Sequence, residues 1–241
     1  MNDANKKLNT GIMQPYFFPY IGYWQLMNAV DNYVIYDDVN YIKNGWINRN
    51  RILIHNAPSY INLQLESASP NKKINEICLN TNGILIKKNL KTIELAYRKA
   101  PFFNSVYPLI KDIIEYEDNN LARYLVYQIR QVASFLDMNT KFYLSSDLKK
   151  NNELRGQDKV IEICKILDSS YYINAIGGRE LYSKDVFKQN GIDLLFLETN
   201  KDMCEYHQYV EDFAPSLSII DVMMFNSKER IKEMLGYYFL K

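Results

Sequence analysis

Two short segments of the chain carry side chains that could bind or transform a charged substrate. Asp37 and Asp38 are adjacent carboxylates that follow the β-type run 33–36. Adjacent side chains project in opposite directions along a strand, so one carboxylate can face a site as a general base while the other caps the next loop. A carboxylate pair is too costly to bury unpaired, and the nearby Arg49 and Arg51 are natural partners for it.

The second segment runs from Trp46 to Arg51 and alternates arginine with asparagine. An extended backbone places Arg49 and Arg51 on one face. Asn48 and Asn50 then lie on the other face. Guanidinium groups suit phosphates and carboxylates, so this segment could read the phosphate of a nucleotide, a nucleotide-sugar or a carrier arm. The alternative is a surface strand whose arginines form salt bridges with the two carboxylates.

The composition indicates an ordinary globular chain. Of 241 residues, 47% are hydrophobic and 24% are charged, which excludes a disordered protein. The net charge of +1 lacks the basic excess of a dedicated nucleic-acid surface. Twenty tyrosines suit a site that stacks on rings or sugars, although a compositional drift towards Asn, Ile, Lys and Tyr gives the same excess.

Other classes of protein and site are disfavoured by what the sequence lacks. Three cysteines without C-x-x-C spacing and two histidines predict no structural zinc site and no other metal. No apolar stretch approaches the ~20 residues of a membrane span. The N-terminus has no signal-peptide pattern, and we therefore expect a cytoplasmic protein.

The order of strand-like and helix-like segments predicts an α/β fold with a Rossmann-like parallel sheet. Residues 11–14 resemble a buried strand, 20–30 a helix and 33–36 a second strand, which together form a βαβ unit. Alternation returns later in the chain. Strands are expected over 141–144, 171–176 and 192–197, and helices over 158–167, 183–190 and, except around Pro215, 203–241.

Two segments interrupt this alternation. Residues 40–66 hold short β-type runs separated by Asn, Gly and Pro, which predicts a flap of hairpin-like strands. Residues 84–138 show helical hydrophobic spacing, which predicts an inserted helical subdomain. The polar residues 1–9 are expected to form a disordered tail, so that residues 10–241 make a single domain.

Open parallel sheets bind ligands beyond the carboxyl ends of their strands, and polar or glycine residues follow each predicted strand here, although strand ends are commonly polar. These residues are Gln14, Asp37 and Asp38, Ser145 and Ser146, Gly177 and Gly178, and Glu198 to Asn200. The glycine pair lacks G-x-G-x-x-G spacing, so a dinucleotide fingerprint is absent. Cys204 and His207 share helical i, i+3 spacing, but no motif around Cys204 supports a catalytic Cys–His pair.

The run from Met13 to Leu53 closely resembles the opening of the WbqC-like family, and a looser likeness continues through nearly the whole chain. The matching motifs are Gln14-Pro15, Pro19-Tyr20-Ile21-Gly22-Tyr23, Asp37-Asp38-Val39 and Asn48-Arg49, then Ala96-Tyr97, Ser145-Ser146, Gly177-Gly178 with Tyr182, and residues 215–221. The resemblance implies an association with bacterial O-antigen or other lipopolysaccharide biosynthesis. It also implies a suggested transfer of glycine, or a related acyl group, to an amino sugar.

The opening of the chain is also similar in layout to nucleotidylyltransferases and class I synthetases, in which a Pro-x-His-x-Gly-His turn joins a strand to a helix. Here the histidine positions fall on Tyr20 and Tyr23. Tyrosine carries no positive charge near pH 7, and loss of one preorganised electrostatic donor costs about 10²–10³ in rate. This likeness therefore supports the fold and a nucleotide-shaped cleft rather than adenylyl transfer.

The predicted function is a transferase that acts on an amino-sugar or nucleotide-sugar intermediate, by acyl or aminoacyl transfer to an amine, with Asp37 or Asp38 as the catalytic group. The candidate substrate-binding residues are Gln14, Tyr20, Gly22, Tyr23, Trp46, Asn48, Arg49, Arg51, Ser145, Ser146, Gly177, Gly178 and Tyr182. The sequence requires no cofactor; a nucleotide-linked donor or an acyl-carrier protein would supply the group. The alternatives are a nucleotide- or sugar-binding module without turnover and a scaffold for polysaccharide assembly. The transferase hypothesis expects the βαβ opening, the carboxylates and the arginines to surround one concavity.

Overall fold

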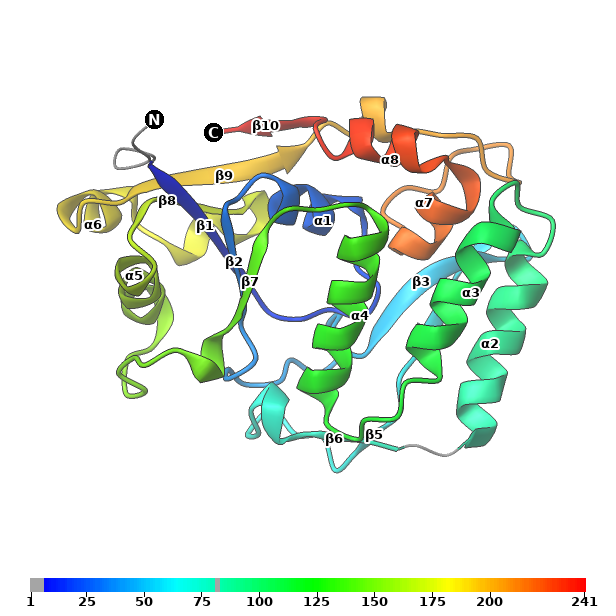
Figure 1. Cartoon of the computed structure of the whole chain (residues 1–241), viewed down its shortest axis with the longest axis horizontal. Helices are drawn as coiled ribbons and strands as arrows, with labels where there is room; N and C mark the ends of the chain where they lie inside the picture. Colours follow the sequence, from blue (N-terminus) through cyan, green and yellow to red (C-terminus); the bar gives the residue numbers. More distant parts are fainter. Residues whose placement is uncertain (1–6, 81–82) are drawn as a thin grey trace.

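The computed structural model describes residues 7–80 and 83–241, and its main sheet in this part of the chain has six strands (Figure 1). Across the sheet the order is β10 (Tyr238–Leu240), β9 (Asp193–Thr199), β8 (Ser169–Ala175), β1 (Leu8–Met13), β2 (Asn32–Ile35) and β7 (Lys141–Leu144). All neighbours are parallel except β10, which is antiparallel to β9. The predicted Rossmann-like α/β fold is therefore confirmed.

The chain leaves the centre of this sheet in two directions. From β1 it runs to β2 and β7 on one side, and it then returns to β8 and β9 on the other. The strand order thus reverses between β1 and β8. Ligands of open α/β sheets bind at such a switch point, beyond the carboxyl ends of the strands.

Helices cover both faces of the sheet, and each face has its own hydrophobic cluster (Figure 1). The first face carries α1 (Ile21–Asn28), α7 (Ile219–Phe225) and α8 (Lys228–Met234), and the second carries α5 (Gly156–Ile166) and α6 (Lys184–Gln189). Along β2, Tyr33 and Ile35 face the α1 cluster and Val34 faces the α5 cluster. Burial on both sides explains why this strand reads as a continuous apolar run.

The segment predicted as a flap holds an antiparallel hairpin of β3 (Arg49–Ile54) and β4 (Ala57–Asn62). A smaller pair, β5 (Leu65–Glu66) and β6 (Cys78–Leu79), follows it. The segment predicted as a helical insertion holds α2 (Gly83–Tyr97), α3 (Phe103–Ile114) and α4 (Leu121–Phe135). Ile93, Ile110 and Ile129 of these helices share one cluster with Trp24 of α1, so they extend the core of the α1 face.

Short 3₁₀ turns complete the chain: η1 (Ile74–Glu76), η2 (Ser145–Asp147), η3 (Ile176–Leu181) and η4 (Asp202–Cys204). None of the helices in residues 7–80 and 83–241 combines the length and apolarity that a bilayer span requires.

Both ends of the chain differ from the sequence-based expectation. β1 begins at Leu8, within the expected tail, because it pairs with β8 and the Asn9 N–H donates to Asp31 Oδ2 at 3.1 Å; residues 1–6 of that tail lie outside the described residues. At the other end, residues 238–240 are a strand that pairs with β9 rather than part of a helix.

The expectation of helix between residue 203 and the exempted region around Pro215 is wrong. The described chain has one 3₁₀ turn there and then an irregular path to the start of α7. Tyr206 and Gln208 donate hydrogen bonds to the buried carboxylate of Asp221, at 2.6 and 2.7 Å. Ser216 adopts a left-handed φ of 57°. These long-range contacts override the local helical pattern.

The loop between β1 and α1 is held by side chains from three distant parts of the chain. Phe18 is buried in a left-handed conformation, with φ of 40°. Its N–H donates to Gln128 Oε1 of α4 at 2.8 Å, and its carbonyl accepts from Asn50 Nδ2 of β3 and from Ser218 Oγ before α7, both at 2.8 Å. The sheet, the hairpin, the inserted helices and the C-terminal segment therefore meet at this loop.

Backbone groups extend the same arrangement to the residues on either side of Phe18. The Phe17 N–H donates to the Trp46 carbonyl at 3.0 Å. The Pro19 carbonyl accepts from Trp24 Nε1 and from the Ile219 N–H, both at 3.0 Å. The buried polar groups at the entrance to α1 thus have partners, as buried backbone groups require.

We expect Asn50→Ala to destabilise the protein by about 1–3 kcal/mol, because the substitution leaves the buried Phe17 carbonyl without its donor. Asn62→Ala, at an exposed position of the same hairpin, should change the free energy of unfolding by less than about 0.5 kcal/mol. Urea unfolding measures both values. Equal effects of the two substitutions would contradict this account of the loop.

Candidate functional site

A cavity of about 390 Å³ lies beyond the carboxyl ends of β1, β8 and β9, next to the switch point of the sheet. Tyr16 to Ile21 contribute one wall from the β1–α1 loop, with Phe17 and Phe18 buried behind it. The hairpin and the loop before it form a second wall with Trp46, Asn50 and Arg51. The ends of β8 and β9 form a third wall with Ile176 and Leu197 to Thr199. The fourth wall comes from the segment after β9 and from α7, and its residues are Lys201, Cys204, Tyr206, Phe213, Pro215 to Leu217 and Val222. The cavity therefore occupies the position that the fold predicts for a ligand.

The turn that opens α1 brings Tyr20 to this cavity. A Cβ atom at Gly22 would lie 2.6 Å from both Thr199 Oγ1 and the Tyr20 ring. Only glycine therefore lets the Tyr20 ring fold across the start of the helix towards β9. Burial raises the pKa of Tyr20, and its hydrogen bond with the Thr199 hydroxyl offsets part of that rise, so the phenol stays protonated near neutral pH.

Gln14 and Tyr23, which were also predicted at this turn, hold it from the core side. The Tyr23 hydroxyl donates to the Gln14 carbonyl at 2.7 Å, and the Tyr23 ring packs in the core against Tyr16 and Tyr33. Gln14, Gly22 and Tyr23 are absent from the cavity lining, whereas Tyr20 is part of it. These residues therefore position the wall that a ligand would touch.

Arg51 supplies a positive charge at the cavity wall. Its guanidinium lies 5.6 Å from the ring centroid of Trp46, and its Nε is buried with no hydrogen-bond partner in the described chain. No described carboxylate forms an ion pair with Arg51 or Arg49. The alternative in which these arginines pair with Asp37 or Asp38 is not what the structure shows.

Asp37 and Asp38 lie at the end of β2 and are not part of the cavity lining. Asp37 is buried and accepts from the Ser146 N–H at 3.0 Å and the Ser146 hydroxyl at 2.6 Å. It also accepts from Asn75 Nδ2 at 3.3 Å. The structure thus brings the βαβ opening and Arg51 around one concavity but places the two carboxylates elsewhere.

Asp38 is the centre of a buried ionic cluster. Its Oδ2 accepts from Lys159 of α5 at 2.9 Å and lies 3.0 Å from Lys150 Nζ, and both lysine side chains are almost fully buried. Burial raises the pKa of Asp38, but hydrogen bonds from Lys159, Ser145 and Lys150 outweigh it and hold the pKa below its usual range. The Asp38 carboxylate, which was predicted to be catalytic, is thus shared by two lysines.

The remaining predicted residues fall into two groups outside the cavity. Ser145 and Ser146 surround the carboxylates, and Tyr182 packs edge-on against Tyr172 and Phe187. Gly177 and Gly178 lie in η3. The Asn48 side chain forms hydrogen bonds with the Tyr41 hydroxyl and the Leu63 carbonyl. The Arg49 guanidinium donates hydrogen bonds to the Gly45 and Asn44 carbonyls. Their predicted contact with a substrate stays a prediction.

The wall formed by residues 201–217 was not predicted from the sequence. Its Tyr206 hydroxyl is held by Asp221, which also accepts from Tyr97 at 2.7 Å and from Gln208. Burial raises the pKa of this carboxyl group. The 215–221 motif of the family resemblance was the available signal, but the helix expected over this region concealed it.

Cys204 lines the cavity without a catalytic partner. The thiol accepts from Gln25 Nε2 at 3.4 Å, and burial raises its pKa, so it is protonated near neutral pH. His207 is exposed on irregular chain rather than one helical turn away. The structure therefore does not form the Cys–His pair.

The cavity combines aromatic walls with cationic groups. Its rings come from Tyr16, Tyr20, Trp46, Tyr206 and Phe213, and its cationic side chains are Arg51 and Lys201. Aromatic faces stack on sugars and nucleobases, and a guanidinium binds phosphate or carboxylate. The site is thus suited to a small anion that carries a ring.

Asp38→Asn should destabilise the protein by about 3–5 kcal/mol, because it leaves two buried ammonium groups without a carboxylate. The matched control is Asp137→Asn, since Asp137 also pairs with two lysines, Lys228 and Lys232, but is 53% exposed. We expect little change for the control in denaturant unfolding. A folded and stable Asp38→Asn protein would show that the cluster is not structural.

The wild type and Asp38→Asn can also be compared as a function of pH. A carboxyl with a lowered folded-state pKa stabilises the fold above its unfolded pKa of about 4, and this stabilisation is lost as the pH falls towards the folded value. The stability gap between wild type and Asp38→Asn should therefore narrow below about pH 4. A gap that widens on acidification would contradict the direction assigned to this pKa.

Comparison with known proteins is consistent with this arrangement. The model of the WbqC-like protein family matches residues 14–233, a range that contains every residue of the cavity lining. The uncharacterized protein Rv1507c of Mycobacterium tuberculosis (strain ATCC 25618 / H37Rv) is 24% identical over 228 residues, which cover 94% of this chain and 96% of that protein. No solved structure matches the chain. Since the family match extends over residues 14–233, which are nearly the whole chain, the chain belongs to the WbqC-like protein family.

Proposed function

We propose that this protein binds a phosphate-bearing sugar derivative, such as a nucleotide-linked amino sugar, in the cavity beside the switch point. We further propose that it is a transferase of bacterial surface polysaccharide or O-antigen biosynthesis, which moves an acyl or aminoacyl group to an amine of this sugar. Membership in the WbqC-like family supports a role in polysaccharide biosynthesis. The observation that carries the proposal is the unpaired guanidinium of Arg51 in an aromatic cavity.

The charge of Arg51 favours an anionic ligand. A half-buried guanidinium without a counter-ion loses hydration and gains no ionic hydrogen bond in return. A bound phosphate would supply these bonds, and hydrogen bonds to charged groups contribute about 1.5–3 kcal/mol each. Both a nucleotide-linked donor and a carrier arm present such a phosphate.

The shape and the walls of the cavity favour a ring beside that phosphate. About 390 Å³ is within the range of small-molecule sites. Tyr16, Tyr20 and Tyr206 offer flat apolar faces, and burial raises the pKa of each phenol so that all three stay neutral. A sugar ring can stack on such faces while its phosphate meets Arg51.

A binding module without turnover is the second candidate. It is favoured by the two predicted catalytic carboxylates, which are occupied by Ser146 and by two lysines, and by the protonated thiol of Cys204. The proposal therefore assigns substrate binding, and no proton transfer, to the residues described above. Incubation with a nucleotide-linked amino sugar and acyl or glycyl donors separates the candidates, because a mass shift of the sugar by the acyl group requires a transferase.

We expect Arg51→Met to weaken binding of nucleotide-linked sugars by about 10- to 100-fold, since it removes the charge and keeps an unbranched stem beside Trp46. Isothermal titration with UDP-N-acetylglucosamine, dTDP-glucose and GDP-mannose measures the loss. Arg123→Met is the control, because Arg123 is exposed and pairs with Asp118 away from the cavity. Binding that is unchanged in Arg51→Met and weakened in Arg123→Met would place the ligand elsewhere.

A further inference from the structure

Two neighbouring aromatic rings, flanked by two guanidinium groups, form a row on the β3–β4 hairpin and the loop before it. The Arg49 guanidinium is 4.7 Å from the Tyr60 ring centroid, the Tyr60 and Trp46 centroids are 6.3 Å apart, and Arg51 is 5.6 Å from Trp46. We name these four residues, Arg49, Tyr60, Trp46 and Arg51, the hairpin row.

Strand geometry and cross-strand pairing position the side chains of this row. Strand alternation turns Asn50 inwards and leaves Arg49 and Arg51 together on the other face of β3. Tyr60 is the direct cross-strand partner of Arg51.

The loop before β3 is bound to the same face. Arg49 Nε donates to the Gly45 carbonyl at 3.1 Å, and another guanidinium nitrogen of Arg49 donates to the Asn44 carbonyl. The Trp46 carbonyl accepts from the Phe17 N–H at 3.0 Å. Trp46 is therefore fixed between the hairpin and the β1–α1 loop.

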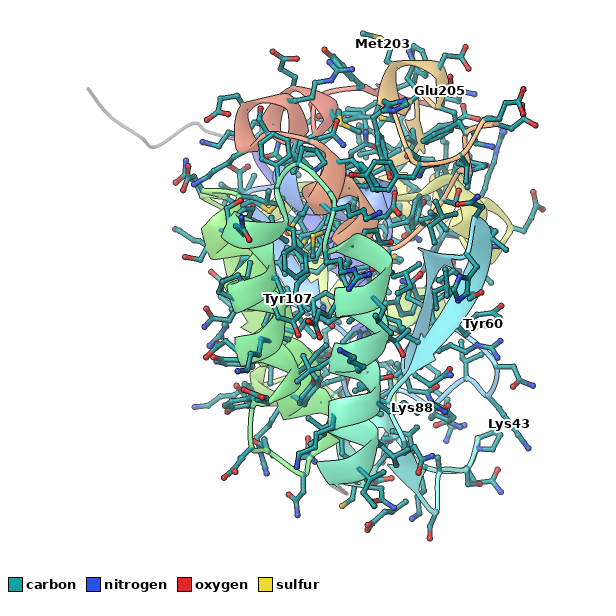
Figure 2. The ribbon with its side chains drawn as sticks, turned by 90° about the vertical axis from the view of Figure 1, so that its right-hand side faces the viewer. Lys43, Tyr60, Lys88, Tyr107, Met203 and Glu205 are labelled. Atoms are coloured by element: carbon teal, nitrogen blue, oxygen red, sulfur yellow. The ribbon has the colours of Figure 1, made fainter. Side chains whose placement is uncertain are left out.

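The hairpin row is open to solvent and uncompensated in charge. Trp46 is 39% exposed and Tyr60 is 48% exposed. In Figure 2, Tyr60 lies on the outer side of the hairpin, and Lys43 projects from the same side of the molecule. Neither arginine of the row forms an ion pair with a carboxylate in residues 7–80 and 83–241.

The hairpin row continues the cavity outwards. Trp46 and Arg51 line the cavity, whereas Arg49 and Tyr60 lie beyond its lining. Arg51 and Trp46 therefore stand at the cavity, with Tyr60 and then Arg49 further out along the row. A ligand that meets both arginines must extend from the cavity onto the hairpin.

We propose that the hairpin row is an outer subsite for the base of a nucleoside diphosphate sugar. The sugar enters the cavity, the diphosphate meets Arg51 at the edge of the cavity, and the base stacks on Trp46 and Tyr60. This inference rests on the proposed function, because it extends the same site. It names the part of the ligand that the cavity holds and the part that the hairpin row holds. Stacking of a base on an exposed aromatic ring is tolerant of base identity, which suits an open surface.

The test compares two ligands that share a sugar. Isothermal titration uses UDP-N-acetylglucosamine against N-acetylglucosamine 1-phosphate, and the corresponding pairs for dTDP-glucose and GDP-mannose. In the wild type, the nucleotide-linked member of at least one pair should bind about 10- to 100-fold more tightly. Tyr60→Ala should lower this preference about tenfold and leave the affinity for the sugar phosphate within about twofold, since stacking on the base is lost and the phosphate contacts remain.

Matched variants separate stacking from other effects. Tyr60→Phe should retain the preference, because it keeps the ring. Phe239→Ala, at a 52% exposed aromatic residue of β10, should also retain it. Arg51→Met should weaken both members of a pair, since the phosphate common to both lies beside Arg51.

Three outcomes would overturn the proposal in distinguishable ways. Equal binding of both members of every pair removes the outer subsite and leaves the proposed function intact. Failure of the wild type to bind any sugar phosphate or nucleotide sugar removes the proposed function together with the subsite. Binding of a ten-residue oligouridylate that is tighter than that of every nucleotide sugar, and that Tyr60→Ala abolishes, assigns the row to single-stranded nucleic acid.

Discussion

The structure depends on the need to satisfy buried polar backbone groups at the exit of β1. Phe17 and Phe18 are fully buried, and the left-handed φ at Phe18 prevents this loop from satisfying its own N–H and C=O groups as a helix would. Partners must come from other parts of the chain, and they come from Asn50, Gln128 and Ser218. These hydrogen bonds fix the hairpin, the inserted helices and the C-terminal segment around β1. The hairpin and the C-terminal segment, together with the loop, form walls of the cavity. The position of the cavity thus follows from the hydrogen bonds that the buried backbone groups of this loop form.

Charge is distributed in two contrasting ways at the carboxyl edge of the sheet. On the α5 side, the carboxylate of Asp38 forms ion pairs with two buried ammonium groups, so these charges have partners within the fold. On the α1 side, Arg51 contacts the Trp46 ring and forms no ion pair with a carboxylate within the described residues. A buried ion pair cannot lose one partner without a large cost in stability, whereas a charge left unpaired at a cavity favours an external anion. This difference supports a structural role for the Asp38 cluster, and it is the ground for the binding role that we propose for Arg51.

Local patterns predicted the parts of the fold whose periodicity reflects their surroundings. The apolar run at Tyr33 to Ile35 marked a central parallel strand, and the alternation through Asn50 and Arg51 correctly separated the inward face of β3 from the outward face. Long-range partners determined the rest. The lysines that neutralise Asp38 lie more than 100 residues away, so its sequence neighbours could not reveal its role. Similarly, the hydrogen bonds of Tyr206 to Asp221 draw its segment into a cavity wall against a helical pattern.

The most direct measurement is a crystal structure of the protein with UDP-N-acetylglucosamine, or with another nucleotide sugar that titration shows to bind. The account predicts phosphate oxygens about 3 Å from the guanidinium of Arg51, with the sugar ring inside the cavity against the β1–α1 loop. Ligand density at the Asp38 cluster on the α5 side, with the Arg51 cavity free of ligand, would contradict the central claim that the cavity at the switch point is the binding site.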